Sequence, residues 1–524
     1  MFSRRLFLSS IGAGAAATAL GAPAILRART LFREYPFRLG VASGDPASDG
    51  FVIWTRLAPE PLEPHAGMAL APIEVEWEVA SDAGFRTIVK SGTALARPEI
   101  GHSVHVEVDG LLSDRPYWYR FTTMGEQSLR GRARTLPMVS ARPDAVRFGV
   151  AGCQNYEDGY YGAYRHLAGE DVAFVYHYGD FIYEYRQEYE FVGGLPVQPV
   201  RRHAYRNLMD VGDYRIAYGQ SLMDVDLQAA RAMHPFLSSF DDHEVQNNWV
   251  SDVDNWALNN DGVNPNPPSA EEFMLRKAAA MQAWYEHMPV RRALLPRGSM
   301  IALNREMRWG DLLSVQMLDT RQYRSDQPCQ DGFKPACPEV TSASSQVLGR
   351  EQEAWLARNL EHGAQWNCLA QQVMMMSLDR RRRAEEPQRI LNMDSWAGYE
   401  AARGRMLSRM AGLGNVVVLT GDEHQNVAGD LVSRDRVVGA EMVVTSISSG
   451  GDGADQRAGS DVLRANNPEV KFVNDQRGYA LCDVGREAWH THFQVVDRVT
   501  TPTNSLSRRA TATLAHGTPG ITIS

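Results

Sequence analysis

Seven polar residues of this 524-residue chain are of types that bind metal ions, and they stand at or just after the ends of apolar runs. They are Cys153, Asp180, Tyr183, Asp242, His243, Asp422 and His424. Two metal ions held a few Å apart can neutralise a phosphate ester and activate a water molecule, with one carboxylate bridging the ions. Asp180 suits the bridging position, and residues from the other runs can complete the two metal sites. The set therefore suggests hydrolysis of phosphate esters.

The stretch 176–184 is the centre of this arrangement. It follows an apolar run, residues 172–175, that is typical of a buried strand. Gly179 frees the backbone after the strand, Asp180 enters the loop, and Tyr183 lies three residues further on. In open α/β sheets, ligands bind beyond the carboxyl ends of the strands. Asp180 and Tyr183 are therefore placed as site residues.

Each residue also has a purely structural interpretation when it is taken alone. An aspartate after a strand is commonly a turn or cap residue, His243 and His424 can be core histidines, and Tyr183 can be a packing residue. Cys153 differs from Cys368 and Cys482, which lie inside apolar strands and are expected to be buried thiols. Residues of metal-binding type follow four different apolar strands, and this repetition favours a shared metal site over four unrelated structural roles.

The composition excludes several other classes of function. The formal net charge is −9, which argues against a general basic surface for nucleic acid. The basic residues are almost all arginine, and no lysine follows a glycine, so a GxxxxGK phosphate loop is absent. His243-Glu244 is the only His-Glu pair, and Asn247 stands where an HExxH zinc motif needs its second histidine.

Residues 34–138 are predicted to form an all-β domain. Ile73, Val75, Trp77 and Val79 alternate with three glutamates, so one face of that strand is expected to be buried and the other exposed. Further short alternating runs with turn residues between them are typical of a sandwich of immunoglobulin or fibronectin type III. A linker over residues 135–143 is expected to close the domain.

Residues 144–500 show strands alternating with helices. Apolar strands are predicted at residues 146–151, 172–175, 312–318 and 416–419, with helices between them. This pattern indicates a layered α/β or α+β domain of about 350 residues, large for one core. Residues 251–269 are predicted to be a long loop, and residues 501–524 a C-terminal tail.

The first thirty residues are predicted to be an export signal. Residues 3–8, Ser-Arg-Arg-Leu-Phe-Leu, resemble the twin-arginine motif, and the run 11–25 is too short and glycine-rich for a stable membrane helix. Cleavage is expected after Ala24 or Ala28, and the alternative is an arginine-rich start of a cytoplasmic helix. We therefore expect a periplasmic or secreted protein that uses the twin-arginine export machinery and has no stable membrane anchor.

Cys329 and Cys337 lie eight residues apart in a loop rich in proline, glycine and aspartate. A local disulfide between them fits an exported protein.

The chain after the signal resembles the PhoD-type alkaline phosphatases, which belong to the calcineurin-like metallophosphoesterases. The resemblance spans residues 36–500 and is carried by motifs at residues 40–46, 52–56, 151–154, 179–183, 241–244, 318–321 and 421–424. It implies a fibronectin-III or immunoglobulin-like β-sandwich followed by a four-layer αββα metallophosphoesterase domain.

The resemblance also implies Fe(III) and Ca²⁺ as cofactors. Carried over by motif, the iron ligands are Cys153, Asp180, Tyr183 and His424, and the calcium ligands are Asp180, Asp242 and Asp422. Soft thiolate with phenolate suits ferric iron, and carboxylates suit calcium. His243 takes the place of the histidine that assists the leaving group.

Two positions depart from the wider superfamily. Asp242 and Asp422 stand where the superfamily usually has asparagine and histidine, which disfavours a zinc or manganese pair. The spacing leaves open whether Asn247 or Asn248 supplies a further calcium ligand.

The function expected from these observations is an exported metallophosphatase that hydrolyses phosphomonoesters, phosphodiesters or both, for phosphate acquisition. A phospholipase D-like phosphodiesterase is the second hypothesis, and an exported metal- or phosphate-binding adhesion protein is the non-enzymatic one. We expect a monomer with a phosphate-ester substrate and no specific nucleic-acid partner.

Overall fold

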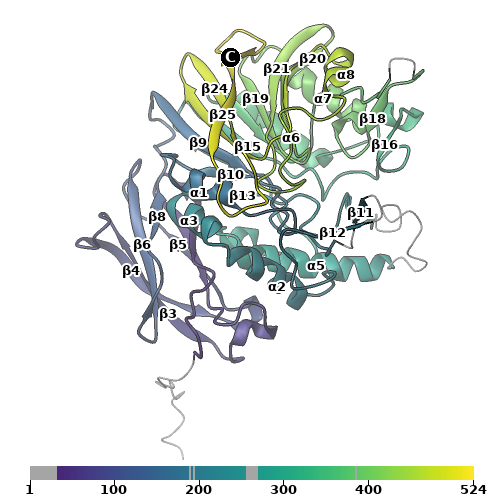
Figure 1. Ribbon diagram of the computed structural model, residues 1–524. Coiled ribbons are helices and arrows are strands. Elements are labelled where there is room, and N and C mark those ends of the chain that lie inside the picture. Colours follow the sequence, from purple (N-terminus) through teal and green to yellow (C-terminus); the bar gives the residue numbers. More distant parts are fainter. Residues whose placement is uncertain (1–31, 188–189, 193–194, 255–268, 384–385) are drawn as a thin grey trace, which may run out of the picture.

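Two mixed β-sheets form the centre of the molecule (Figure 1). The computed structural model describes residues 32–187, 190–192, 195–254, 269–383 and 386–524. In spatial order, the ten-stranded sheet comprises β26 (Thr522–Ile523), β25 (Leu506–Ala515), β24 (Ala488–Val496), β23 (Gly478–Gly485), β9 (Ala145–Ala151), β10 (Val175–His177), β13 (Pro235–Ser238), β1 (Val41–Ala47), β2 (Gly50–Arg56) and β5 (Ser103–Val108). The seven-stranded sheet comprises β14 (Arg305–Trp309), β15 (Leu313–Met317), β17 (Trp366–Ala370), β19 (Val416–Thr420), β21 (Arg436–Val443), β20 (Asn426–Ser433) and β22 (Val470–Asn474).

The two sheets share one hydrophobic core. Val150 and Tyr176 of the first sheet pack in the same cluster as Val417 and Leu419 of the second. The strands that lead to the predicted site are parallel: β10 pairs with both β9 and β13, and β19 pairs with β17. Strands buried on both faces read as continuous apolar runs, which explains why these runs were visible in the sequence.

Helices cover the outer face of each sheet. The helices are α1 (Gly162–Ala168), α2 (Val211–Leu222), α3 (Val225–Met233), α5 (Ala270–His287), α6 (Gly349–Glu361), α7 (Glu400–Met410) and α8 (Ser460–Asn466). Leu167, Tyr218 and Trp284 of α1, α2 and α5 share a core with the first sheet, and Leu356 and Met406 of α6 and α7 share one with the second. The layers therefore run helix, sheet, sheet, helix, as the resemblance implied.

The N-terminal β module is joined to the ten-stranded sheet. Its five-stranded sheet comprises β4 (Ile88–Ala96), β3 (Ile73–Ala80), β6 (Pro116–Thr123), β7 (Glu126–Gln127) and β8 (Gly131–Arg134). Val75 and Tyr119 of this sheet pack against Ile53 and Val106 of β2 and β5. Because β1 pairs in parallel with β13, the opposing strands of the module continue the ten-stranded sheet. Strands β1, β2 and β5 thus belong both to the module and to the ten-stranded sheet, and the sandwich of immunoglobulin or fibronectin topology over residues 34–138 stays a prediction.

The prediction of a C-terminal tail over residues 501–524 is wrong. Strand β25 pairs along β24, and β26 pairs with β25, so the segment forms the edge of the ten-stranded sheet beyond β24 (Figure 1). Ala510, Ala512 and Leu514 are buried in the core between the sheets, while the residues between them are not. This period of two is the strand pattern, and small alanines on the buried face made it inconspicuous in the sequence.

Short elements complete the chain. They are the strands β11 (Glu190–Val192), β12 (Leu195–Val197), β16 (Phe333–Pro335) and β18 (Ile390–Asn392), and the 3₁₀ helices η1 (Pro64–Gly67), η2 (Pro98–Ile100), η3 (Arg292–Leu294), η4 (Pro338–Thr341) and η5 (Trp396–Tyr399). The predicted export signal and most of the predicted loop 251–269 lie outside the described residues. Among the residues that are described, no helix has the length and apolar character needed to span a membrane.

The predicted disulfide between Cys329 and Cys337 is present, with their Cα atoms 5.8 Å apart. Cys153, Cys368 and Cys482 are free and buried, as expected for the latter two.

Candidate metal centre and active site

The ends of four strands converge on the candidate site. Cys153 follows β9, Asp180 follows β10, and Asp242 and His243 follow β13, all in the ten-stranded sheet. Asp422 and His424 follow β19 in the facing sheet. All seven predicted site residues are therefore near one another, although they lie up to 271 positions apart in the sequence (153 to 424).

The backbone at these positions is unusual. The φ angles are +49° at Cys153, +55° at Asp180, +68° at Asp422 and +52° at His424. Positive φ costs a non-glycine residue of order 1 kcal/mol or more, and it persists where the surrounding structure enforces it, often at functional sites. Four of the seven predicted site residues therefore have a backbone conformation that the surrounding structure must enforce.

Thiol, phenol, carboxylate and imidazole groups meet in one half of the site. The Cys153 thiol donates to Asp180 Oδ2 over 3.2 Å, and the Tyr183 hydroxyl donates to the same oxygen over 3.1 Å. The Tyr183 oxygen lies 3.3 Å from His424 Nε2. Ligand atoms of Cys153, Asp180 and His424 all lie within 4.8 Å of one another, close enough to hold one ion.

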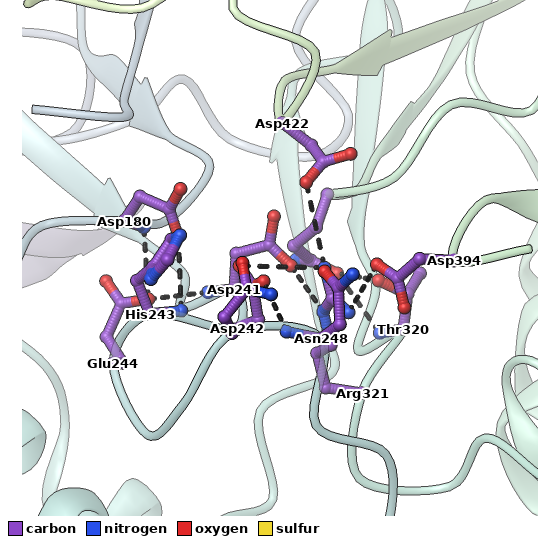
Figure 2. Close-up of polar contacts among 12 residues, drawn as sticks. Asp180, Asp241, Asp242, His243, Glu244, Asn248, Thr320, Arg321, Asp394 and Asp422 are labelled. Atoms are coloured by element: carbon purple, nitrogen blue, oxygen red, sulfur yellow. Dashed lines mark hydrogen bonds and ion pairs between the residues drawn. The ribbon is translucent and has the colours of Figure 1, made fainter. Parts of the chain in front are cut away.

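Carboxylates make up the other half of the site (Figure 2). Ligand atoms of Asp241, Asp242 and Asp422 lie within 4.8 Å of one another, and so do those of Asp180, Asp242 and His243. Asp180 therefore belongs to a group in each half, which is the bridging position predicted for it. Asp241 was not among the predicted metal ligands.

Arg321 is the cation of the acidic half. Its side chain is fully buried; Nε donates to Asp241 Oδ1 over 2.6 Å and Nη1 to Asp394 Oδ2 over 2.7 Å. Its Nη2 lies 3.7 Å from Asp242 Oδ1 and 3.8 Å from Asp422 Oδ1, longer than hydrogen bonds. Figure 2 shows the guanidinium beneath the carboxylates, between Asp242 and Asp394. One arginine thus faces four carboxylates.

The electrostatics of the site show a surplus of negative charge. Burial raises the pKa of Asp180 and of Asp422 well above their usual value, and neighbouring aspartates raise both further. Burial also raises the pKa of Asp241, to about 6, against the opposing effect of Arg321. Asp242 is the exception, because Arg321 and His243 outweigh its burial and lower its pKa.

The donor set fits two cations. Asp241 Oδ2 and Asp242 Oδ1 are buried and have no hydrogen-bond partner among the described residues. Buried polar atoms are normally satisfied, and a group of orphaned carboxylate oxygens is what a cation site leaves when only protein atoms are counted. The thiol, phenol and imidazole of the first half suit a transition metal, whereas the all-oxygen second half suits a hard cation.

His243 is oriented by a carboxylate and an aromatic ring. Its Nδ1–H donates to Glu184 Oε2 over 2.7 Å, and its ring stacks on Tyr183 with 4.1 Å between ring centroids. Burial opposes protonation of the ring, but Glu184 and Asp242 outweigh it and hold the pKa of His243 well above its usual value. His424 behaves in the opposite way, because burial lowers its pKa to about 3, so it is neutral and available as a ligand.

Three supporting residues escaped the sequence analysis. Glu244 accepts hydrogen bonds from the backbone N–H groups of Asp180, Phe181 and Asp241, which ties the ends of β10 and β13 together. Glu184 orients His243, and Ser449 Oγ lies 2.6 Å from the Tyr183 oxygen. Glu184 and Glu244 directly follow Tyr183 and His243 in the sequence, so this adjacency could have identified them. No sequence feature pointed to Ser449.

The two asparagines proposed as alternative ligands differ in position. The backbone N–H of Asn248 donates to Asp242 Oδ2 over 2.7 Å, whereas that of Asn247 donates to Glu184 Oε1 over 2.7 Å. Asn248 therefore lies beside the acidic half and Asn247 beside the dyad of Glu184 and His243.

Comparison with known proteins gives the same assignment as the geometry. A family model described as PhoD-like phosphatase matches residues 148–493, and one described as PhoD-like phosphatase, N-terminal domain, matches residues 22–137. This chain belongs to the PhoD-like phosphatase family. It is therefore a hydrolase that acts on phosphate esters, and the non-enzymatic alternative is removed.

Relatives of this PhoD-like phosphatase agree over nearly its whole length. Alkaline phosphatase D of Bacillus subtilis (strain 168) is 44% identical over 487 residues, which cover 91% of this chain and 81% of the relative. A solved structure described as the structure of PhoD superposes with a TM-score of 0.87 at 43% identity, covering 93% of this chain and 92% of that one. A purple acid phosphatase from yellow lupin seeds, 10% identical, has a TM-score of 0.52 over 89% of this chain and 72% of its own. The last match concerns the fold alone.

Proposed function

We propose that this phosphatase is an exported two-metal enzyme that hydrolyses phosphomonoesters, phosphodiesters or both, and that it releases phosphate for uptake. The observation that carries the metal dependence is the pair of orphaned oxygens on Asp241 and Asp242, buried beside two further carboxylates and a single arginine. Such a cluster is costly to bury without additional positive charge.

The two halves of the site point to different ions. Cys153, Asp180, Tyr183 and His424 would hold Fe(III), because thiolate and phenolate are anionic donors that favour a trivalent ion. Asp180, Asp242 and Asp422 would hold Ca²⁺, a hard cation that prefers oxygen. Bound there, the ions would supply positive charge to the phosphate and lower the pKa of a water molecule that becomes the nucleophile.

The protein residues supply orientation and proton transfer. Glu184 accepts the Nδ1–H of His243 and stabilises the protonated ring, in which Nε2 also carries a proton that can pass to the leaving oxygen. Glu184 and Asp242 outweigh the burial of His243 and hold its pKa well above the usual value, which favours the protonated ring. Asp180 serves both halves and fixes their separation.

The test is elemental analysis of the protein purified from its export compartment, with one mono- and one diester assayed in parallel. We expect iron and calcium in the protein, reversible loss of both activities in a calcium chelator, and retention of iron during that treatment. Oxygen-only calcium sites exchange more readily than sites that contain a thiolate, which is the reason for the difference. Full activity in excess chelator would rule out the mixed-metal assignment.

The ratio of the two activities separates the remaining alternatives. A phosphodiesterase of the phospholipase D type would prefer the diester and release a phosphomonoester, whereas a phosphatase that serves phosphate acquisition would release inorganic phosphate from the monoester.

A further inference from the structure

The loop closed by the disulfide, residues 329–337, contacts the acidic half of the site. Asp331 lies in this loop, between the two cysteines. Its Oδ2 accepts a hydrogen bond from Asn248 Nδ2 over 2.8 Å, and the backbone N–H of the same asparagine donates to Asp242 Oδ2 over 2.7 Å. One asparagine therefore connects the disulfide loop to a predicted calcium ligand.

A second connection runs through the backbone. Strand β16, inside the loop, pairs with β18, and the N–H of Met393 donates to Gly332 O over 3.0 Å. Asp394 follows directly and binds both Arg321 and Arg324. The loop thus contacts the acidic half on two sides, at Asn248 and at Asp394.

The loop has little packing of its own to hold it there. The strands β16 and β18 have three residues each, and Phe333 is 61% exposed. Cys329, Gln330 and Gly332 all have positive φ, which the first two adopt at a cost. The core beneath the loop consists of Val340, Leu391, Met393 and Ala397, with the two cysteines packed against it. Short exposed segments of this kind open locally unless they are cross-linked.

We propose that Asp331 is a positioning residue for the acidic half, that the Cys329–Cys337 disulfide holds it in place, and that the enzyme gains its full calcium affinity only on oxidation of this pair. The proposal rests on the proposed calcium site at Asp242. In the oxidation, the two thiols lose two protons and two electrons and form one S–S bond. A disulfide oxidant of the export compartment accepts the electrons and becomes a dithiol.

The consequence is a safeguard on where the enzyme acts. Protein folded in a reducing compartment would have the thiol half of the site complete but the acidic half loosely held. Cellular phosphate esters would then be spared until the protein reached an oxidising compartment, where the disulfide forms.

The test uses the full-length purified enzyme and three variants. Cys329→Ala/Cys337→Ala removes the cross-link, Asp331→Ala removes the carboxylate with the cross-link intact, and a triple variant combines them. Lys334→Ala is the control, because its ammonium contacts Gln330, in the same loop, over 3.1 Å, away from Asn248. For each protein, calcium is removed with a chelator and titrated back, with activity, bound iron and thermal midpoint recorded.

We expect the double-cysteine variant and Asp331→Ala each to need at least about tenfold more calcium for half-maximal activity, the usual effect of losing a residue that orients a metal ligand. Iron content and the calcium requirement of Lys334→Ala should match the wild type. The triple variant should be no worse than either parent, because both changes would act through one contact.

The outcomes separate this proposal from the proposed function. A wild-type enzyme without a calcium requirement would refute the calcium site itself. A calcium-dependent wild type whose cysteine variant keeps its calcium requirement would overturn only the role of the disulfide. If the increases in calcium requirement add up in the triple variant, or if iron is lost together with calcium, the variants destabilise the protein generally and the proposed contact is refuted. If the cysteine variant does not fold, Asp331→Ala, which keeps the disulfide, still tests the contact between Asp331 and the acidic half. An unchanged calcium requirement in Asp331→Ala would overturn the proposal.

Discussion

Tyr183 contacts four other residues of the site. Its hydroxyl oxygen lies within hydrogen-bond distance of Asp180, His424 and Ser449, and its ring stacks on His243. Burial, with Asp180 and Cys153 adding to it, raises the pKa of Tyr183 well above its usual value, so the phenol is neutral without a cation. A bound cation would favour the phenolate form, which is the role proposed for this residue as an iron ligand.

Replacement of Tyr183 by phenylalanine tests this role. The phenolate on Fe(III) should give the protein a visible absorption band, with a separate contribution from the Cys153 thiolate. In Tyr183→Phe the phenolate band should disappear and activity should fall at least about tenfold, while the thermal midpoint changes little because the ring remains. Absorption spectra and initial rates measure both effects.

Tyr185→Phe is the matched control, because this ring also lies beside His243, with 5.8 Å between centroids, but was not predicted to be a ligand. If the spectrum of Tyr183→Phe equals that of the wild type, Tyr183 packs only and the iron assignment fails.

At the scale of elements, the site depends on how strand ends are fixed to one another. Glu244 ties β10 to β13 in the first sheet. Glu441 of β21 has the equivalent role in the second, because it accepts hydrogen bonds from Thr420 at the end of β19 and from the backbone of Met375 and Met376. Both glutamates are buried, and burial raises the pKa of each to about 7.

Glu441 is expected to make stability depend on pH. Because its folded pKa of about 7 lies above the ordinary value of 4.5, the folded state binds the proton more tightly than the unfolded state does. The free energy of unfolding should therefore fall as pH rises from about 4.5 to 7, by up to roughly 3 kcal/mol, and level off above that range.

Thermal midpoints of metal-stripped protein, measured from pH 4.5 to 8, check this expectation against Glu441→Gln. The variant cannot ionise, so its midpoint should fall less over this range than that of the wild type. Glu353→Gln is the control, a glutamate on α6 that binds Arg405. Parallel curves for the wild type and Glu441→Gln would contradict the assigned titration.

At the scale of the whole molecule, N-terminal and C-terminal strands lie at opposite sides of the ten-stranded sheet. Strands β1, β2 and β5 from the N-terminal module extend one side of the ten-stranded sheet, and β23 to β26 from the C-terminal segment extend the other. The match to the N-terminal family model ends at residue 137, and the match to the phosphatase model begins at residue 148, inside β9. The module and the catalytic region therefore share backbone hydrogen bonds between β1 and β13.

Export is predicted to depend on Arg4 and Arg5. Replacing both with lysine keeps the charge but removes the twin-arginine motif, so uncleaved precursor should accumulate in the cytoplasm. Fractionation followed by immunoblotting measures this. Arg27→Lys/Arg29→Lys is the matched control and should be exported normally; normal export of the Arg4→Lys/Arg5→Lys protein would reject the signal assignment.

The sequence by itself determined the parts of this protein that have local patterns. Continuous apolar runs predicted the buried parallel strands β9, β15 and β19, because strands covered on both faces carry no polar alternation. The run 172–175 overlaps β10 only at Val175. The residues directly after them predicted the site, because the carboxyl ends of parallel strands lie at one edge of a sheet. The close spacing of Cys329 and Cys337 was enough for the disulfide.

Only the tertiary structure decided what depends on long-range contacts. The pairing of β1 with β13 and of β25 with β24 joins strands of the N-terminal module and the predicted tail to one sheet, and strand pairing has no local signal in the sequence. The same holds for Arg321, whose four carboxylate neighbours come from three other parts of the chain. Charge balance in a buried site is a sum over residues brought together by folding, so no single motif contains it.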